Sequence, residues 1–121
     1  MAYMNKIISE VSTRIEVTSL ADALPTYQTL AGTDDVHRFQ FPEFALAVVG
    51  PFMLLEGDRE TLAKYRRSAT LIVTDMAAAV DAFTSKGGAV IDGPGQAGAG
   101  VRAIVEDRDG NVFECFQRSI G

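Results

Sequence analysis

The sequence predicts one α+β domain made of two copies of a β-strand, an α-helix and three further β-strands, a unit written βαβββ. The length of 121 residues suits a single domain. Part of the sequence recurs further along the chain, and the signals for strands and helices recur with it. Apolar residues make up 47% of the chain, which is enough to build a core without disulfides.

The repeat is clearest where the first strand of each copy leads into its helix. Val17-Thr18 recurs as Val73-Thr74, and the flanking alanines recur at the same offset. Near the end of each copy, Leu54-Leu55-Glu56 lies over Val112-Phe113-Glu114 with two further residues of offset, which is what a loop insertion produces. We expect repeat one over about 10–57, a linker over 58–67 with a short helix, and repeat two over about 68–118.

The first copy starts with a strand in which Thr13, Ile15 and Val17 alternate with Ser12, Arg14 and Glu16. A helix follows. Pro25 places its regular start near Asp22, because proline is tolerated in the first turn, and Gly32 is its expected end. Three strands follow, over residues 36–41, 44–49 and 52–56, separated by Pro42 and by Gly50-Pro51.

The second copy repeats this order. Asp75 is the expected N-cap of its helix, and Gly87-Gly88 the expected end. Strands are expected over 89–92, 101–106 and 112–117, with a hairpin at Asp107-Arg108-Asp109-Gly110-Asn111. Gly93 to Gly100 is expected to be a mobile loop and a candidate lid.

Composition excludes several partners and suggests a compartment. The net charge is −5 and basic residues do not cluster, so a nucleic-acid partner is not expected. Apolar runs stay well below the roughly 18 residues of a membrane span. With a single cysteine, Cys115, an internal disulfide is impossible, and we expect a reducing, cytoplasmic setting.

The two strand-to-helix steps, Val17-Thr18-Ser19-Leu20 and Val73-Thr74-Asp75-Met76, and the hairpin that ends in Val112-Phe113-Glu114, resemble the vicinal oxygen chelate superfamily. This superfamily includes glyoxalase I, extradiol dioxygenases and bleomycin-resistance proteins. The resemblance covers about residues 10–118. It implies two βαβββ units whose curled mixed sheet forms a U-shaped cavity, and it implies a homodimer.

The resemblance also implies where metal ligands would lie. Metal-dependent members use a histidine, glutamine or glutamate on the first strand of each unit and a glutamate on the last. The last-strand positions fall on Glu56 and Glu114, and the first-strand positions on Ser12 and Ser68. Serines are not credible ligands for zinc, iron or nickel. We therefore expect no metal or other cofactor, with Glu56 and Glu114 as weak candidate ligands.

Strand alternation predicts which side chains line the cavity. If both glutamates face it, the ligand-binding residues comprise Arg14, Glu16, Phe52, Leu54, Glu56, Thr70, Arg102, Glu114 and Phe116. One hypothesis is that Arg14 replaces the metal by neutralising the glutamates. The alternative places Arg14 at the rim, paired with Glu16 or solvent. His37 is expected at the surface, and Cys115 buried and inert, although either could be reactive.

Three functions remain open at this point. The first is a metal-free binding protein that sequesters an antibiotic or metabolite, taken up as a small hydrophobic or partly cationic molecule. The second is an enzyme: a metal-dependent lyase, isomerase or dioxygenase, or a metal-free one with Glu114 or His37 as base. The third is an interaction module with a filled cavity. The identity of the ligand, the role of residues 1–9, and whether the cavity closes within one chain or across a dimer are not determined by the sequence.

Overall fold

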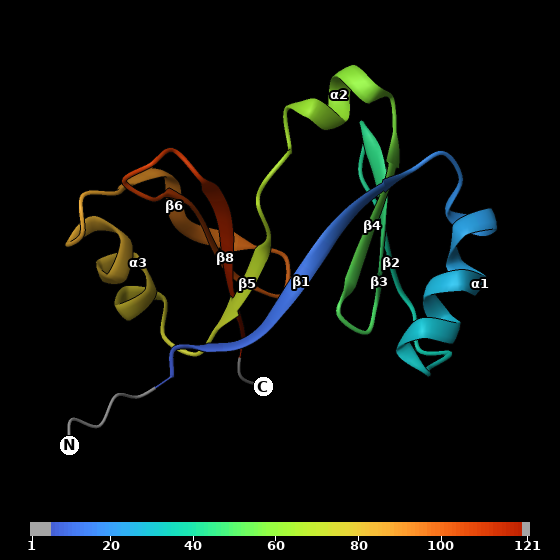
Figure 1. The fold of residues 1–121 in the computed structure, drawn as a ribbon, viewed down its shortest axis with the longest axis horizontal. Coiled ribbons are helices and arrows are strands. Elements are labelled where there is room, and N and C mark those ends of the chain that lie inside the picture. Colours follow the sequence, from blue (N-terminus) through green and yellow to red (C-terminus); the bar gives the residue numbers. More distant parts are fainter. Residues whose placement is uncertain (1–5, 120–121) are drawn as a thin grey trace. The chain divides into compact units, whose positions relative to one another are not determined.

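The structure is a computed structural model that describes residues 6–119 (Figure 1). Its elements in order are β1 (Ile8–Val17), α1 (Leu20–Ala31), β2 (His37–Gln40), β3 (Phe44–Val49), β4 (Phe52–Gly57), α2 (Arg59–Ala63), β5 (Thr70–Val73), α3 (Met76–Thr84), β6 (Ala89–Ala97), β7 (Gly100–Glu106) and β8 (Val112–Arg118). This order contains the βαβββ unit twice and confirms the expected α+β fold class. Of residues 1–9, whose role the sequence left open, 1–5 lie outside the described part.

The chain divides into two compact units. The first unit runs from Ser12 to Arg66, and the second takes the chain up to Val11 and again from Arg67 onward. The hydrogen-bonded strand order is β2-β3-β4-β1-β5-β8-β7-β6, with β1 shared between the units. In each unit the first strand pairs with the last strand in parallel, β1 with β4 and β5 with β8, while the remaining pairs are antiparallel. The strands that open and close each repeat are therefore neighbours.

Both long helices begin at capping side chains. The Ser19 side chain accepts a hydrogen bond from the backbone N–H of Asp22, and that of Asp75 accepts one from Ala78. Asp75 is thus confirmed as an N-cap. The expected start of the first helix near Asp22 was wrong, because α1 begins at Leu20 and contains Pro25 within it. Its end is confirmed at Gly32, which has a φ of 67°.

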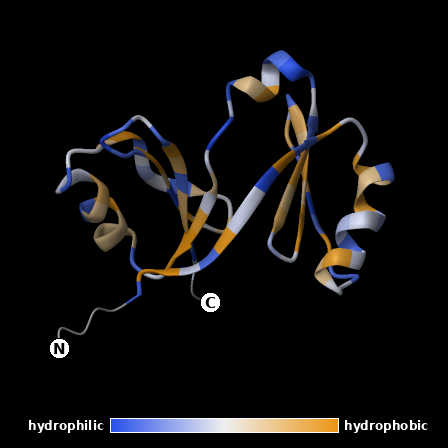
Figure 2. Cartoon of the chain, viewed as in Figure 1, coloured by the Kyte–Doolittle hydropathy of each residue, from blue (hydrophilic) through white to orange (hydrophobic). Residues whose placement is uncertain are grey.

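The core of the first unit has two layers, one on each face of its sheet. Helix α1 covers one face, where Leu20 and Leu24 pack against Leu54 and Val49. The opposite face carries Met53, Leu55 and Leu46, with Leu62 of the short helix α2 packed on them. Figure 2 shows strands β3 and β4 coloured mostly toward the hydrophobic end of the scale. Strand β4 is therefore apolar on both faces.

The core of the second unit has one apolar layer, between α3 and its sheet. Met76 and Ala79 of α3 pack on Leu71, Ala103 and Cys115. Since successive strand residues point to opposite faces, Thr70, Arg102, Glu114 and Phe116 lie on the face away from α3. That alternation confirms the expected orientation of β8.

The glycine-rich segment 93–100 departs from the expected loop. Strand β6 continues to Ala97 and pairs with β7 as far as Gly100, with register shifts on either side of Asp92. The turn between these strands lies at Gly98-Ala99, where Gly98 has a φ of 54°. The expectation of an open loop was wrong because antiparallel pairing with β7 satisfies the backbone of this segment. Within residues 6–119, no helix reaches the length and apolarity that a bilayer crossing needs.

Candidate functional site

The face of the second unit away from α3 carries a connected polar cluster. Glu114 accepts a hydrogen bond from the Thr70 hydroxyl at 2.9 Å and another from Arg102 Nε at 2.9 Å. A second arm of the same guanidinium, Nη1, lies 3.5 Å from a carboxylate oxygen of Asp92 on β6. We call Thr70, Asp92, Arg102 and Glu114 the polar cluster.

Strand register brings these side chains together. Thr70 and Glu114 are direct partners across the parallel β5–β8 pair, and Arg102 lies opposite Phe116, the next residue of β8 on that face. Thr70 is 1% exposed, and the Glu114 side chain is 19% exposed. A carboxylate at this depth needs partners, and the guanidinium supplies a countercharge while the hydroxyl supplies a hydrogen bond.

Asp92 differs from Glu114 in its burial. Its side chain is 69% exposed, and it belongs to the irregular part of β6. Its ion pair with Arg102 is therefore solvent-screened and weak, whereas the Arg102–Glu114 pair is shielded. Asp92 was not among the predicted site residues. The strand was expected to end at Asp92, whereas β6 continues past it to Ala97.

The corresponding face of the first unit carries a different set of groups. Arg14 Nη2 donates to the backbone carbonyl of Tyr65 at 2.7 Å, and Nη1 lies 3.3 Å from Met53 Sδ. Glu16 is held by Arg66, with contacts of 2.8 and 3.1 Å. The hydrogen bond from Arg66 lowers the pKa of Glu16. The charge of Arg14 also lowers the pKa of Glu16, and the alternative that places Arg14 at the rim, paired with Glu16 or solvent, stays a prediction.

Glu56 does not lie where the sequence placed it. Its Oε1 accepts a hydrogen bond from the backbone N–H of Leu20 at 2.7 Å, at the start of α1. In the register of β1 and β4, Glu56 lies opposite Val17 and shares the helix-covered face with Leu54. Arg14 lies on the other face, so the hypothesis that it neutralises Glu56 was wrong. A pairing of Arg14 with Glu114 joins the two units and stays a prediction.

Two further predicted cavity residues also lie under α1. Phe52 packs edge to face on Tyr27 with ring centroids 5.0 Å apart, and Leu54 is fully buried in the core beneath the helix. Both were assigned to the wrong face together with Glu56. A one-residue error in a strand moves every side chain to the opposite face, which explains why the three failed together.

The pairing registers give the correct correspondence between the repeats. Arg14 pairs with Met53 in the first unit, and Thr70 pairs with Glu114 in the second. Since Arg14 and Thr70 correspond, Glu114 corresponds to Met53 and not to Glu56. The residue that corresponds to Glu56 is Gln117, whose Oε1 accepts from the backbone N–H of Met76 at 2.7 Å, just as Glu56 accepts from Leu20.

This correspondence shows that the residues present do not fit the metal site of the family's metal-dependent members. The four positions concerned hold Ser12, Met53, Ser68 and Glu114, and the one carboxylate among them is paired with Arg102. Across residues 6–119, no three histidine, cysteine, aspartate or glutamate side chains are grouped so as to hold a metal ion. Hard cations need several oxygen ligands and transition metals need imidazole or thiolate, and this set offers neither.

Cys115 and His37 lie apart from the polar cluster in different ways. Cys115 is fully buried against α3, and burial followed by the charge of Glu114 raises the pKa of its thiol to about 11. It is therefore a packing residue and not a nucleophile at neutral pH. His37 is exposed on β2, with Nε2 3.4 Å from Asp35.

Two βαβββ units, each closing its sheet by pairing first and last strands, define the class of fold that the sequence motifs indicated. The sequence model of the Glyoxalase/Bleomycin resistance protein/Dioxygenase superfamily matches residues 16–115. The chain therefore belongs to this superfamily. No curated protein matches the sequence.

Solved structures support the same fold. An uncharacterised protein from Methanosarcina mazei is 29% identical, with a TM-score of 0.84 over 93% of this chain and 94% of that one. Methylmalonyl-CoA epimerase from Mycobacterium tuberculosis is 15% identical, with a TM-score of 0.71 over 98% and 94%. A hypothetical protein from Bacillus halodurans is 19% identical, with a TM-score of 0.60 over 94% and 95%. The last two similarities concern the fold alone.

Proposed function

We propose that this chain is a metal-independent small-molecule-binding protein, whose ligand contacts the polar cluster on the face of the second unit away from α3. One observation carries the proposal. Glu114, the last-strand glutamate that the family resemblance marks as a metal ligand, is instead held by Arg102 and Thr70.

Electrostatics explains why this arrangement disfavours a metal. A divalent cation bound to Glu114 would lie within a few ångströms of the Arg102 guanidinium, and like charges at that distance repel strongly in a partly buried site. Arginine stays charged at all relevant pH values, so deprotonation cannot relieve this repulsion. A metal could bind only if the Arg102–Glu114 contact were broken.

The charges of the cluster suggest the character of the ligand. Arg102 faces two carboxylates, Glu114 and Asp92, so the cluster carries a net formal charge of about −1. Phe116 lies on the same face and offers an apolar surface. These features favour a ligand with an apolar body and a hydrogen-bond donor or positive charge. Sequestration of such a compound, an antibiotic or a metabolite, by a cytoplasmic homodimer is the physiological form of the proposal.

A screen for binding with and without a chelator tests it. Unfolding temperature would be measured for the purified chain with a panel of apolar amines and neutral aromatics, in excess EDTA and without it. We expect amines that raise the unfolding temperature equally in both conditions, and a smaller shift in Glu114→Gln but not in Arg108→Gln, whose side chain is exposed on the hairpin. Stabilisation that disappears with EDTA would contradict the proposal and favour the metal-dependent enzyme.

A further inference from the structure

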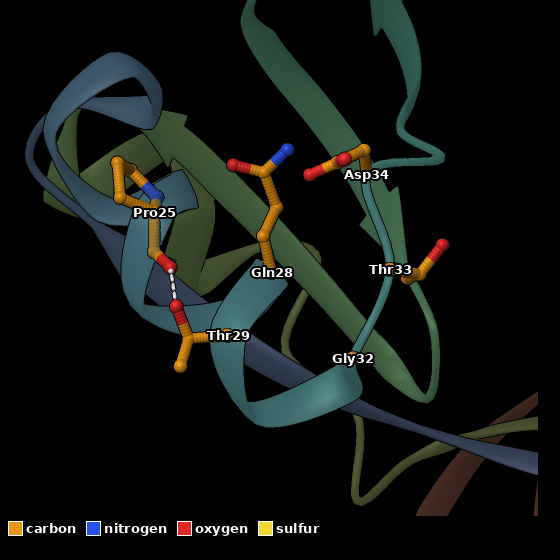
Figure 3. A pocket seen from close by; sticks show the side chains of 6 residues that line it. All are labelled: Pro25, Gln28, Thr29, Gly32, Thr33 and Asp34. Carbon is orange, nitrogen blue, oxygen red and sulfur yellow. Dashed lines mark hydrogen bonds between the residues drawn. The ribbon is translucent and has the colours of Figure 1, made fainter.

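A hollow lies at the C-terminal end of α1, within the first unit. It has a volume of about 400 Å³ and is lined by Pro25, Gln28, Thr29, Gly32, Thr33 and Asp34 (Figure 3). Ligand pockets in proteins have volumes of roughly 300–1,000 Å³, so the hollow is large enough for a small molecule. None of its lining residues was predicted from the sequence as a site residue, and the proposed function does not use them.

Hydrogen bonds hold the two walls of the hollow together, one wall being the last turns of α1 and the other the segment that follows the helix. Gly32 N–H donates to the Thr29 carbonyl at 3.3 Å, and Thr33 N–H donates to the Gln28 carbonyl at 3.2 Å. The Thr33 hydroxyl accepts from Asp35 N–H at 3.0 Å, which fixes the turn beyond it. Because these contacts belong to the chain itself, the hollow is formed before a ligand binds, and little ordering is needed on binding.

Two polar side chains of the hollow are available to a ligand. Figure 3 shows the Asp34 carboxylate and the Gln28 amide directed into the same space. Neither side chain has a hydrogen bond or an ion pair with another group of residues 6–119. The Thr29 hydroxyl, in contrast, is already used, because it donates to the Pro25 carbonyl at 3.0 Å. The carboxylate and the amide are therefore the groups that a ligand would contact.

The charges around the hollow favour a cation. The backbone carbonyl groups at the end of a helix carry a partial negative charge, and the Asp34 carboxylate adds a full one. The last turn of α1 contains no basic residue that would neutralise them. The neighbouring Asp35 carboxylate has a partner of its own, since one of its oxygens lies 3.4 Å from His37 Nε2. An anionic ligand would be repelled, and a neutral one would leave the Asp34 carboxylate without a countercharge.

The acceptors of the hollow distinguish between kinds of cation. A primary or secondary ammonium group has more than one N–H donor, and the hollow offers the carboxylate oxygens of Asp34 and the amide oxygen of Gln28 as acceptors. A quaternary ammonium group carries the same charge but has no N–H, so it cannot use these acceptors. The Pro25 ring lines the same hollow and offers an apolar surface to a short carbon chain.

From these observations we propose that the hollow at the C-terminal end of α1 is a second binding site, which takes a small primary or secondary ammonium compound through Asp34 and Gln28. Asp34 supplies the countercharge, and the Gln28 amide oxygen accepts a further N–H. Because Asp34 is exposed, solvent screens the ion pair, and we expect a Kd on the order of 1–10 mM for a short amine. The proposal is independent of the proposed function, whose polar cluster belongs to the second unit.

An NMR titration of isotope-labelled protein with propylammonium chloride tests the proposal, at constant ionic strength and in a buffer without amines. We expect saturable shifts of the backbone amides of residues 32–34 and of the Gln28 side-chain amide. Asp34→Asn should weaken this binding about tenfold, because it removes the countercharge and keeps the shape of the side chain. Asp35→Asn removes the adjacent carboxylate, serves as the matched control, and should change the Kd by less than about twofold.

Tetramethylammonium distinguishes a specific site from general attraction of cations. It has the charge but no N–H donor, so we expect its affinity for the hollow to be at least about fivefold weaker. Glu114→Gln, in the second unit, should leave the propylammonium titration of residues 32–34 unchanged, so this proposal and the proposed function are tested separately. Shifts that do not saturate, an equal affinity for tetramethylammonium, or an equal loss in Asp34→Asn and Asp35→Asn would each overturn the proposal.

Discussion

The hydrogen bond from Leu20 N–H to Glu56 is the most informative interaction to remove, since it decides which face of β4 this glutamate occupies. If Glu56 served a ligand site, Glu56→Ala would change binding and leave stability nearly unaffected. In the structure it supports the start of α1 with an N···O distance of 2.7 Å. We therefore expect Glu56→Ala to lower the free energy of unfolding.

The magnitude follows from the chemistry of that bond. A hydrogen bond to a charged group contributes about 1.5–3 kcal/mol. A carboxylate at a helix N-terminus contributes about 0.3–1 kcal/mol through the dipole. The Ser19 cap at the same end remains in place and limits the loss. We expect about 2 kcal/mol for Glu56→Ala, and less than about 1 kcal/mol for Glu56→Gln, which keeps the acceptor and loses only the charge.

Urea unfolding followed by circular dichroism measures these differences. The second repeat supplies a matched comparison, because Gln117 accepts from Met76 N–H at the same 2.7 Å with a neutral side chain. Gln117→Ala should cost about 1 kcal/mol, less than Glu56→Ala. A Glu56→Ala variant as stable as the wild type, or a Glu56→Gln variant as unstable as Glu56→Ala, would refute the reasoning.

Three shorter predictions follow from other contacts. Burial raises the pKa of Cys115 to about 11, so iodoacetamide should not label it at pH 8 in the folded chain, and rapid labelling would contradict this. The free energy of unfolding should also fall as pH rises from the usual thiol pKa toward that value, because the thiol ionises first in the unfolded chain. The Asn111 side chain lowers the pKa of Asp107, so Asn111→Ala should raise that pKa in an NMR titration, and an unchanged midpoint would count against the contact. Gly100→Ala should destabilise the chain by about 2 kcal/mol or more in urea, since its Cβ would meet the Gln117 carbonyl oxygen at 2.1 Å; wild-type stability would show that β7 and β8 can separate there.

The sequence predicted the elements well because each has its own local signal. Asp75 was identified as a cap and Gly32 as a helix end, and the structure places both there. In β8, the polar Glu114 stands between apolar Phe113 and Cys115, and the fully buried Cys115 packs toward α3. The assumption that Glu114 faces the cavity, combined with alternation, therefore gave the correct orientation of that strand.

The same method failed on β4 for a physical reason. Residues Phe52 to Leu55 are apolar without interruption, because one face packs under α1 and the other under α2. A strand that is buried on both faces has no alternation to read. Its orientation was instead taken from matching Glu56 to Glu114, two glutamates in similar local sequence. Gln117 was the better match for Glu56, but only strand register makes that correspondence visible.

Contacts between residues that are far apart in the chain could also not be predicted from the sequence. Arg66 and Tyr65 lie in what was read as a linker, yet one holds Glu16 and the other accepts from Arg14. Nothing in local composition indicates that a segment 50 residues away returns to this face. The choice between a metal and an arginine beside Glu114 likewise depended on the β7–β8 pairing that positions Arg102.

Elemental analysis of the purified chain tests the metal-independent proposal most directly. The protein would be expressed with added zinc, nickel, manganese and iron, purified without chelators, and compared with Glu114→Gln prepared in the same way. The pairing of Glu114 with Arg102 predicts only traces of each metal, at the same level in both proteins. A content near one metal ion per chain in the wild type, lost in Glu114→Gln, would contradict the proposal and establish a metal centre in its place.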